Sequence, residues 1–232
     1  MPGQHRNAAL PGFPSMKRAA SRNTAASVKQ RLLNLSKERH EDFNFLLTRF
    51  AAERFLYRLH RSRHARAFVL KGAMLFHLRA GRLPHRTTRD VDLTARGSPD
   101  LESQTASFQE ICAVRVVRDG LLFLDESVRV DRIQAEEEYQ GVRVHLEARL
   151  GSARIPLQVD VAFGDVLTPP PRRVRLKTLL EFPAPILFVC PWETVVAEKL
   201  QALVELGMAN SRMKDFFDRG TSRPACPSMG RS

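Results

Sequence analysis

The chain has 232 residues, of which 43% are hydrophobic, enough to bury the core of one large or two small domains. No window approaches 18 consecutive apolar residues, and the basic N-terminus lacks the apolar run of a secretory signal, so we expect no membrane contact. Three widely spaced cysteines, an odd number, favour a reduced cytoplasmic protein over a disulfide scaffold or a zinc site.

Positive charge is concentrated in the first part of the sequence. The net charge is +12, and residues 1–90 hold 19 of the 37 Lys and Arg but only 5 of the 25 acids. A basic half of this kind favours a polyanionic partner, because neutralising phosphates releases their counterions. A solvated helix surface in an Arg-rich chain is the alternative explanation.

The first elements in chain order are helices. Residues 1–26 mix Pro, Ser, Asn and basic residues without periodicity, which predicts disorder. Ser27 is a candidate N-cap for a helix that ends at about Arg39. Apolar residues at 3–4 spacing predict a second helix from about Asp42 to Arg61, in which Arg54 alone interrupts the apolar stripe.

In the middle of the chain, apolar and polar residues mostly alternate, which predicts strands. The segment AFVLKGAML (67–75) predicts a short buried strand that enters a helix at Gly72, and RDVDLTA (89–95) predicts a second strand. Ser98 and Pro99 form a typical N-cap and first-turn pair for a helix to about Val114. Three further strands are expected, at 121–133, 139–150 and 154–163.

The rest of the chain is expected to be helical after a connector. A Pro-rich extended connector (167–186) precedes a helix that starts at Pro191 and ends at Gly207. The order of the elements predicts an α+β fold with a mostly antiparallel mixed sheet. The expected organisation is a disordered basic N-terminus, a core with N-terminal helices, the start of a truncated C-terminal helical part, and an atypical disordered tail, at residues 1–26, 27–190, 191–218 and 219–232.

Two acids one residue apart raise the question of a metal site. On a strand, Asp90 and Asp92 lie on one face, where two carboxylates repel each other unless a cation lies between them. A solvated edge strand could carry such a pair, but hard oxygen ligands also suit Mg²⁺ or Mn²⁺. Asp160 is the natural third ligand, since an unpaired ionised Asp in its otherwise apolar strand would be costly.

Phosphate-binding features accompany these acids. A glycine at the expected strand-to-helix junction, Gly72, would expose backbone N–H groups at a helix start, where phosphate binds readily. Arg86 and Arg89 precede the acids and could hold further phosphate oxygens. Together these residues predict a metal-dependent phosphoryl-transfer site.

Five stretches in this order resemble a known family: LKGAMLF, HRTTRDVDL, IPLQVDVAFGD, ETVVAEKLQAL and NSRMKDFFD. They span roughly residues 27–219 and are similar to the nucleotidyltransferase AbiEii/AbiGii toxins, the toxin halves of type IV toxin–antitoxin and abortive-infection systems. The resemblance implies a polymerase-β-like nucleotidyltransferase core with flanking helices, followed by a helical domain.

The resemblance also implies roles for individual residues. The nucleotide-site motif of the family matches Lys71, Gly72 and Ala73, although most nucleotidyltransferases have a second Gly or Ser where Ala73 stands. The Arg and Ser/Thr before the acids match Arg86 and Thr88, and the metal ligands match Asp90, Asp92 and Asp160. The helical Lys of the family, which takes part in catalysis, matches Lys199, and the motif that contacts nucleotide and supports the metal matches Lys214, Asp215 and Asp218.

The sequence therefore predicts a cytoplasmic nucleotidyltransferase toxin. With Mg²⁺ or Mn²⁺ it would transfer a nucleoside monophosphate from a nucleoside triphosphate to an acceptor such as a tRNA end, and an antitoxin could be encoded nearby. One alternative is a catalytically dead remnant or nucleic-acid-binding module, since the sequence leaves the family pattern at about Arg219 and would leave an apolar helix face bare. Another is a small-molecule nucleotidyltransferase of the antibiotic-modifying kind.

Overall fold

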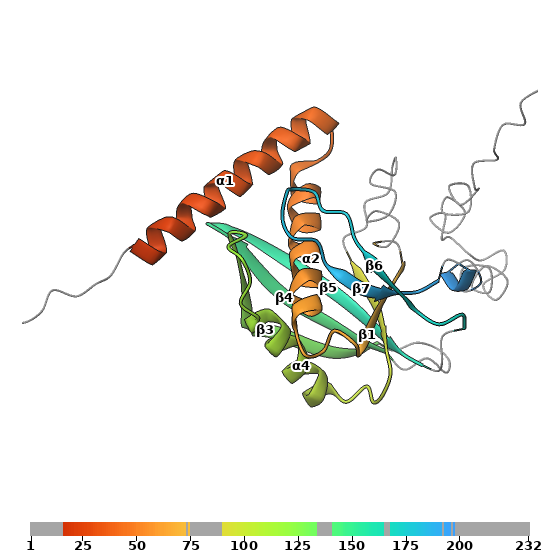
Figure 1. The fold of residues 1–232 in the computed structure, drawn as a ribbon. Coiled ribbons are helices and arrows are strands. Elements are labelled where there is room, and N and C mark those ends of the chain that lie inside the picture. The colour runs from red at the N-terminus through yellow and green to blue at the C-terminus, as the bar shows by residue number, and fades with distance from the viewer. Residues whose placement is uncertain are drawn as a thin grey trace, which may run out of the picture.

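The computed structural model describes residues 16–72, 74, 90–133, 141–164, 168–191, 193–195 and 197, with side chains from residue 24 onward. None of the helices in these ranges is long and apolar enough to cross a membrane. The named elements, drawn in Figure 1, are α1 (Met16–Arg39), α2 (Phe43–Arg61), β1 (Phe68–Lys71), β2 (Val91–Ala95), α4 (Leu101–Ala113), β3 (Leu121–Ile133), β4 (Gly141–Leu150), β5 (Ala153–Phe163), β6 (Arg172–Arg175) and β7 (Ile186–Val189).

All of these strands form one mixed sheet, in the order β3-β4-β5-β2-β1-β7-β6. Of its six pairings, β1–β7 and β2–β5 are parallel and the other four are antiparallel. The predicted α+β fold with a mostly antiparallel mixed sheet is therefore confirmed. The two parallel pairings lie on either side of the β1–β2 pair, in the middle of the sheet.

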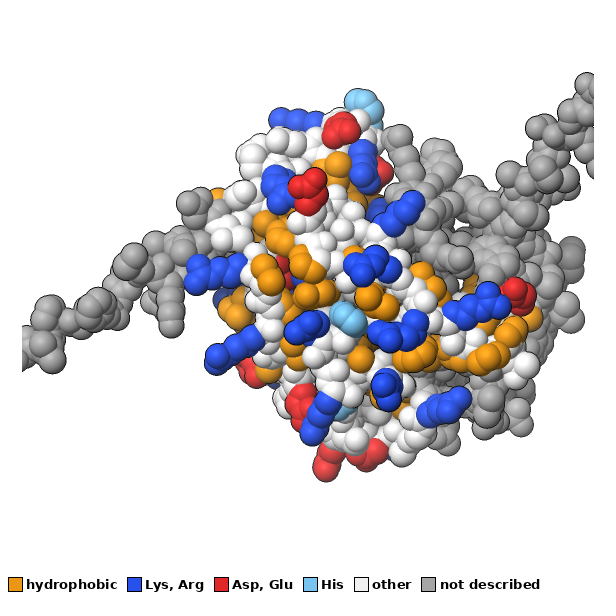
Figure 2. All heavy atoms as spheres, viewed as in Figure 1, with side chains coloured by type: hydrophobic (Ala, Val, Ile, Leu, Met, Phe, Trp, Pro, Cys, Tyr) orange, Lys and Arg blue, Asp and Glu red, His pale blue; other side chains and the backbone are white. Residues whose placement is uncertain are grey.

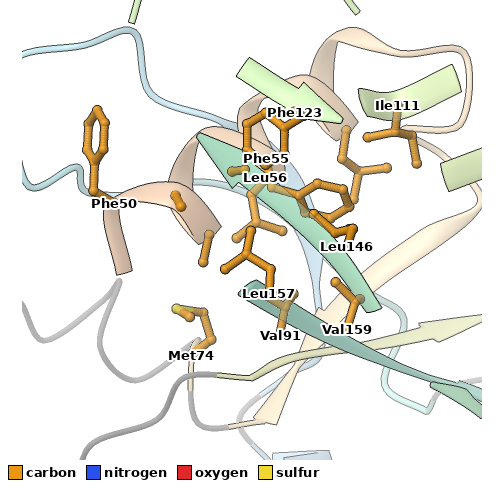
Figure 3. Packing of buried hydrophobic residues seen from close by; sticks show 14 of the residues in the cluster. Phe50, Phe55, Leu56, Met74, Val91, Ile111, Phe123, Leu146, Leu157 and Val159 are labelled. Carbon is orange, nitrogen blue, oxygen red and sulfur yellow. The ribbon is translucent and has the colours of Figure 1, made fainter. Parts of the chain in front are cut away.

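One face of the sheet carries the core. Strands β1, β2 and β5 bury every second residue, and α2 crosses this face (Figure 1). In Figure 3, Phe55 and Leu56 of α2 pack over Leu157 and Val159 of β5 and Val91 of β2. The intervening residues of these strands are half-buried or exposed and belong to the opposite face, which we call the second face.

Helix α2 follows its sequence prediction closely. Asp42 is its N-cap, and the Asp42 carboxylate accepts a hydrogen bond from the backbone N–H of Phe45 at 2.7 Å. Its apolar stripe is buried as expected. Arg54, which interrupts that stripe, is completely buried as well, with 0% of its surface exposed. A buried guanidinium of this kind needs an acid as its partner.

Three predicted boundaries are wrong. Helix α1 begins at Met16 rather than at Ser27, because its Ala, Lys and Arg residues favour a helix even without an apolar stripe. The N-cap of α4 is Asp100 rather than Ser98, since the Asp100 carboxylate accepts the N–H of Ser103 at 2.8 Å. The expected connector at 167–186 contains β6 and the first residue of β7, because its prolines flank these strands and do not interrupt them.

Candidate active site

The site begins where β1 ends beside β2. These strands are antiparallel, and their register pairs Lys71 with Asp92. The next residue, Gly72, has a φ of +70° and is helical, as is Met74, so the predicted strand-to-helix junction is present. A Cβ atom on Gly72 would lie 2.0 Å from Oδ2 of Asp92, closer than any real contact. Only glycine lets the backbone approach this carboxylate and adopt this φ without strain.

The acid on β5 lies beside the acid on β2. The parallel β2–β5 register pairs Asp92 with Asp160, so both side chains are on the second face. Neighbouring strands are about 4.8 Å apart, which brings the two carboxylates close together. Asp90 directly precedes β2 and is exposed. The structure thus brings together Gly72, Asp92 and Asp160, which lie far apart in the sequence.

A cation from β4 already binds Asp160. The Arg143 guanidinium donates from Nε to Oδ1 and from Nη2 to Oδ2 of Asp160, both at 2.9 Å. Gln158 donates a further bond to Oδ1 at 3.2 Å. The hydrogen bonds to Asp160 raise the pKa of Arg143, and its attraction to Asp160 and Asp90 adds to that effect. The charge of Asp160 is therefore compensated by an arginine in this structure.

The sequence contained the signal for this arginine. Leu150 pairs with Ala153 across the turn between β4 and β5, and the same register places Arg143 opposite Asp160. A hairpin turn fixes the register of its two strands. Counting back from the turn would therefore have identified Arg143 as the residue facing Asp160.

The carboxylate oxygens are of the kind that binds a divalent cation, but the acids do not surround one common metal position. Among the described residues, no group of three or more His, Cys, Asp or Glu side chains is arranged to hold a metal ion. Asp92 and Asp160 offer hard oxygen ligands side by side, and Gly72 leaves the space that a Cβ would fill. These donors fit Mg²⁺ or Mn²⁺. Arg143 and such a metal would compete for the two oxygens of Asp160.

The other predicted site residues lie outside the described part of the chain. They are Ala73, Arg86, Thr88, Arg89, Lys199, Lys214, Asp215 and Asp218. Their placement beside the acids stays a prediction. The described residues Lys71, Gly72, Asp90, Asp92 and Asp160 lie at one end of the β1–β2 pair and on the adjacent strand β5.

A glycine at the end of β1 beside acids on two parallel strands is the arrangement that the sequence predicted for a nucleotidyltransferase. Comparison with known families specifies it further. The sequence profile described as "Nucleotidyl transferase AbiEii toxin, Type IV TA system" matches residues 54–220, which is more than half of the chain. The chain belongs to this AbiEii family, as its motifs predicted.

Solved structures are similar only at a distance. A candidate nucleotidyltransferase from H. pylori matches with a TM-score of 0.45 and 14% identity, over 74% of this chain and 65% of that one. JHP933 from Helicobacter pylori matches with a TM-score of 0.41 and 14% identity, over 71% of this chain and 60% of that one. The chain thus spans less than two thirds of the length of either protein. No curated protein sequence matches it.

Proposed function

We propose that this protein transfers a nucleoside monophosphate from a nucleoside triphosphate to the end of an RNA, such as a tRNA, in the bacterial cytoplasm. The observation that supports this most directly is the contact between Gly72 and Asp92, with Asp160 in register beside them. Membership of a type IV toxin family supports a role as a toxin that a cognate antitoxin counteracts.

Each residue of the site has a distinct part in the proposed reaction. The strand-to-helix junction at Gly72 would offer backbone N–H groups to the triphosphate, and Lys71 would add positive charge beside it. Asp90 and Asp92 would hold Mg²⁺ or Mn²⁺, with Asp160 as the third ligand. The bound metal would neutralise phosphate charge and lower the pKa of the acceptor hydroxyl. The acceptor oxygen forms a bond to the α-phosphorus as the bond to pyrophosphate breaks.

Several roles depend on residues outside the described ranges. Lys199 would neutralise charge on the leaving pyrophosphate, and Arg86 and Thr88 would contact the phosphates. Lys214, Asp215 and Asp218 would support the nucleotide and the metal ligands. Ala73 would pack beside the phosphate site. These assignments come from the motifs of the family.

Substitution of Asp92 tests the proposal. The protein is incubated with each radiolabelled nucleoside triphosphate, Mg²⁺ and total tRNA, and labelled RNA is counted. We expect Asp92→Ala to lower transfer at least about 100-fold, because the metal that Asp92 would hold neutralises charge on the reacting phosphate. Asp125→Ala removes an exposed acid on β3 and serves as the matched control.

The outcome separates the candidate functions. Retained transfer in Asp92→Ala, with circular dichroism equal to that of the wild type, would contradict the assignment. RNA binding without transfer by the wild type would favour a nucleic-acid-binding module. Transfer to aminoglycosides in a panel of small hydroxylated acceptors, but not to RNA, would favour a small-molecule nucleotidyltransferase.

A further inference from the structure

A cavity opens on the second face of the sheet, toward the end of the β1–β2 pair that lies opposite Gly72 and Asp90. It has a volume of about 220 Å³, and its walls include Val69, Thr94 and Phe188. Val69 pairs with Thr94 on one side and with Phe188 on the other, so the three side chains point to the same face. Thr94 follows Asp92 by two residues, which is about 7 Å along a strand. The cavity and the carboxylates therefore belong to one continuous surface.

Arginines surround this cavity. Arg66 and Arg96 line it and are exposed. On the edge strand β6, Arg173 is directly opposite Phe188, so its side chain points to the same face, and Arg175 follows two residues later. Among the described residues, no acid forms an ion pair with any of these four arginines.

Positive charge gathers further at this edge of the sheet. Burial lowers the pKa of His60, at the end of α2, and Arg61, Arg173 and Arg175 lower it further by repelling its charged form. Figure 2 shows the α2 side of the molecule, where Lys and Arg side chains are common and acids few around the region of β6 and β7. Like charges brought together without acids repel each other, so a bound polyanion would stabilise this surface.

We propose that the cavity and its arginines bind a single-stranded segment of the acceptor RNA. Arg66, Arg96 and Arg173 contact its phosphates, and one base enters the cavity against Phe188. This inference rests on the proposed function for the identity of the polymer. An acidic protein could also bind arginines, but the apolar cavity between them and its continuity with Asp92 fit a polymer that alternates phosphates and flat bases.

The salt dependence of RNA binding tests the phosphate contacts. Binding of fluorescent single-stranded RNA is titrated over a range of salt concentrations in full-length Asp92→Ala protein, so that no transfer interferes. For single strands the slope of log K against log salt is about −0.7 per phosphate contact. The triple variant Arg66→Gln, Arg96→Gln, Arg173→Gln should therefore make this slope shallower by about 2.

A matched control removes the same charge from the opposite edge of the sheet. Arg115, Arg118 and Arg132 are exposed residues on or just before β3, the other edge strand. Their triple substitution by Gln should leave the slope almost unchanged. Equal effects of the two triple variants would overturn the proposal, because binding would then follow net charge alone.

Substitution of Phe188 tests the base contact. Phe188→Ala should weaken RNA binding roughly tenfold at every salt concentration without changing the slope, because stacking involves no counterion. Phe188→Leu keeps the packing of this half-buried side chain and should bind RNA almost as weakly, which separates stacking from misfolding. Wild-type affinity in Phe188→Leu, alongside weak binding in Phe188→Ala, would overturn the base contact.

Two further outcomes separate this inference from the proposed function. The wild type could bind RNA but transfer no nucleotide, with only the first triple variant binding RNA more weakly. That result would support the RNA-binding surface and reject the proposed nucleotidyltransferase activity. Nucleotide transfer to RNA that the first triple variant leaves intact would support the enzyme and overturn the surface. Loss of binding to an acidic antitoxin, with RNA binding unchanged, would assign the surface to the protein partner and overturn the proposal.

Discussion

The two faces of the sheet carry charged clusters of opposite character. On the α2 side, Asp119 accepts hydrogen bonds from Nε of Arg54 at 3.0 Å and from Nη1 of Arg58 at 2.8 Å, and no more than 6% of any of the three side chains is exposed. On the second face, Arg143 and Asp160 form an equally short pair, but 42% and 23% of their side chains are exposed.

Exposure decides what each pair can do. The guanidinium of Arg54 also donates to the carbonyl oxygen of Pro183 at 2.8 Å and lies over the rings of Tyr57 and Phe182, at 4.3 and 5.3 Å from their centroids, so it is held in place on several sides. Buried charges of this kind are costly to separate. Water and ions reach the Arg143–Asp160 pair, and its attraction is screened. The buried cluster around Asp119 therefore stabilises the fold, whereas Asp160 can exchange Arg143 for another cation.

The largest expected effect is the removal of the buried acid. Asp119→Ala leaves Arg54 and Arg58 buried without a counter-charge, and we expect it to lower the free energy of unfolding by about 3–5 kcal/mol. Urea denaturation followed by circular dichroism measures this loss. Glu147→Ala, which removes an acid paired with the exposed Arg149 and Arg154, is the control and should leave the midpoint almost unchanged. Similar midpoints for the two variants would contradict the distinction between the faces.

A second buried acid on α2 should make stability depend on pH. Burial raises the pKa of Glu53 to about 7 from an ordinary value of 4.5, although Arg49 and the backbone N–H of Leu179 oppose this shift. Between these values the folded state binds more protons at Glu53 than the unfolded state, so the contribution of Glu53 to stability is greatest below about pH 4.5 and falls as the pH rises through 7. The loss amounts to about 3 kcal/mol.

The variant Glu53→Gln isolates this contribution. It keeps an oxygen that can accept the N–H of Leu179 but cannot titrate. The difference in unfolding free energy between wild type and variant, measured by urea denaturation from pH 5 to 8, should therefore change steadily in favour of the variant. A difference that stays constant over this range would show that Glu53 does not titrate near 7.

Substitution of Gly72 should affect activity more than stability. An alanine there would have to hold a φ of +70° and move the Asp92 carboxylate, which lies 2.0 Å from the new Cβ. We expect a loss of about 1–2 kcal/mol in stability from the backbone alone and a loss of at least about 100-fold in nucleotide transfer. Gly97→Ala is the control, since Gly97 has a φ of +106° but nothing within 4 Å of an added Cβ. Equal losses of transfer in the two variants would contradict a specific role for Gly72.

The sequence predicted the parts of this protein that depend on local pattern. The stripe of α2 and the alternation around Asp92 and Asp160 follow periods of 3.6 and 2 residues, so the elements and the faces of their side chains could be deduced. Contacts between residues of distant elements could not be deduced in this way. Asp119 follows α4 in a short loop, and nothing near it in the sequence indicates that it pairs with Arg54. Arg143 is a different case: the family motifs do not contain it, but the register of the β4–β5 hairpin would have identified it.

The smallest expected effect on stability concerns Arg143 itself. Arg143→Gln should change the free energy of unfolding by no more than about 1 kcal/mol, because the pair is largely solvated. If Asp160 serves as a metal ligand, its release should strengthen Mn²⁺ binding several-fold, since the guanidinium and the metal compete for the same two oxygens. Isothermal titration calorimetry with Mn²⁺ and no nucleotide measures this gain directly.

Two controls separate competition from a general change of charge. Arg154→Gln removes an equal charge from the same pair of strands, where Arg154 binds Glu147 instead of Asp160, and should leave Mn²⁺ affinity unchanged. Adding Asp160→Asn to Arg143→Gln should abolish the gain, because the third ligand is then lost. An affinity unaltered by Arg143→Gln would mean that Asp160 is paired for stability alone and that Asp90 and Asp92 hold the metal without it. The partner of one half-buried carboxylate thus decides whether the second face has two metal ligands or three.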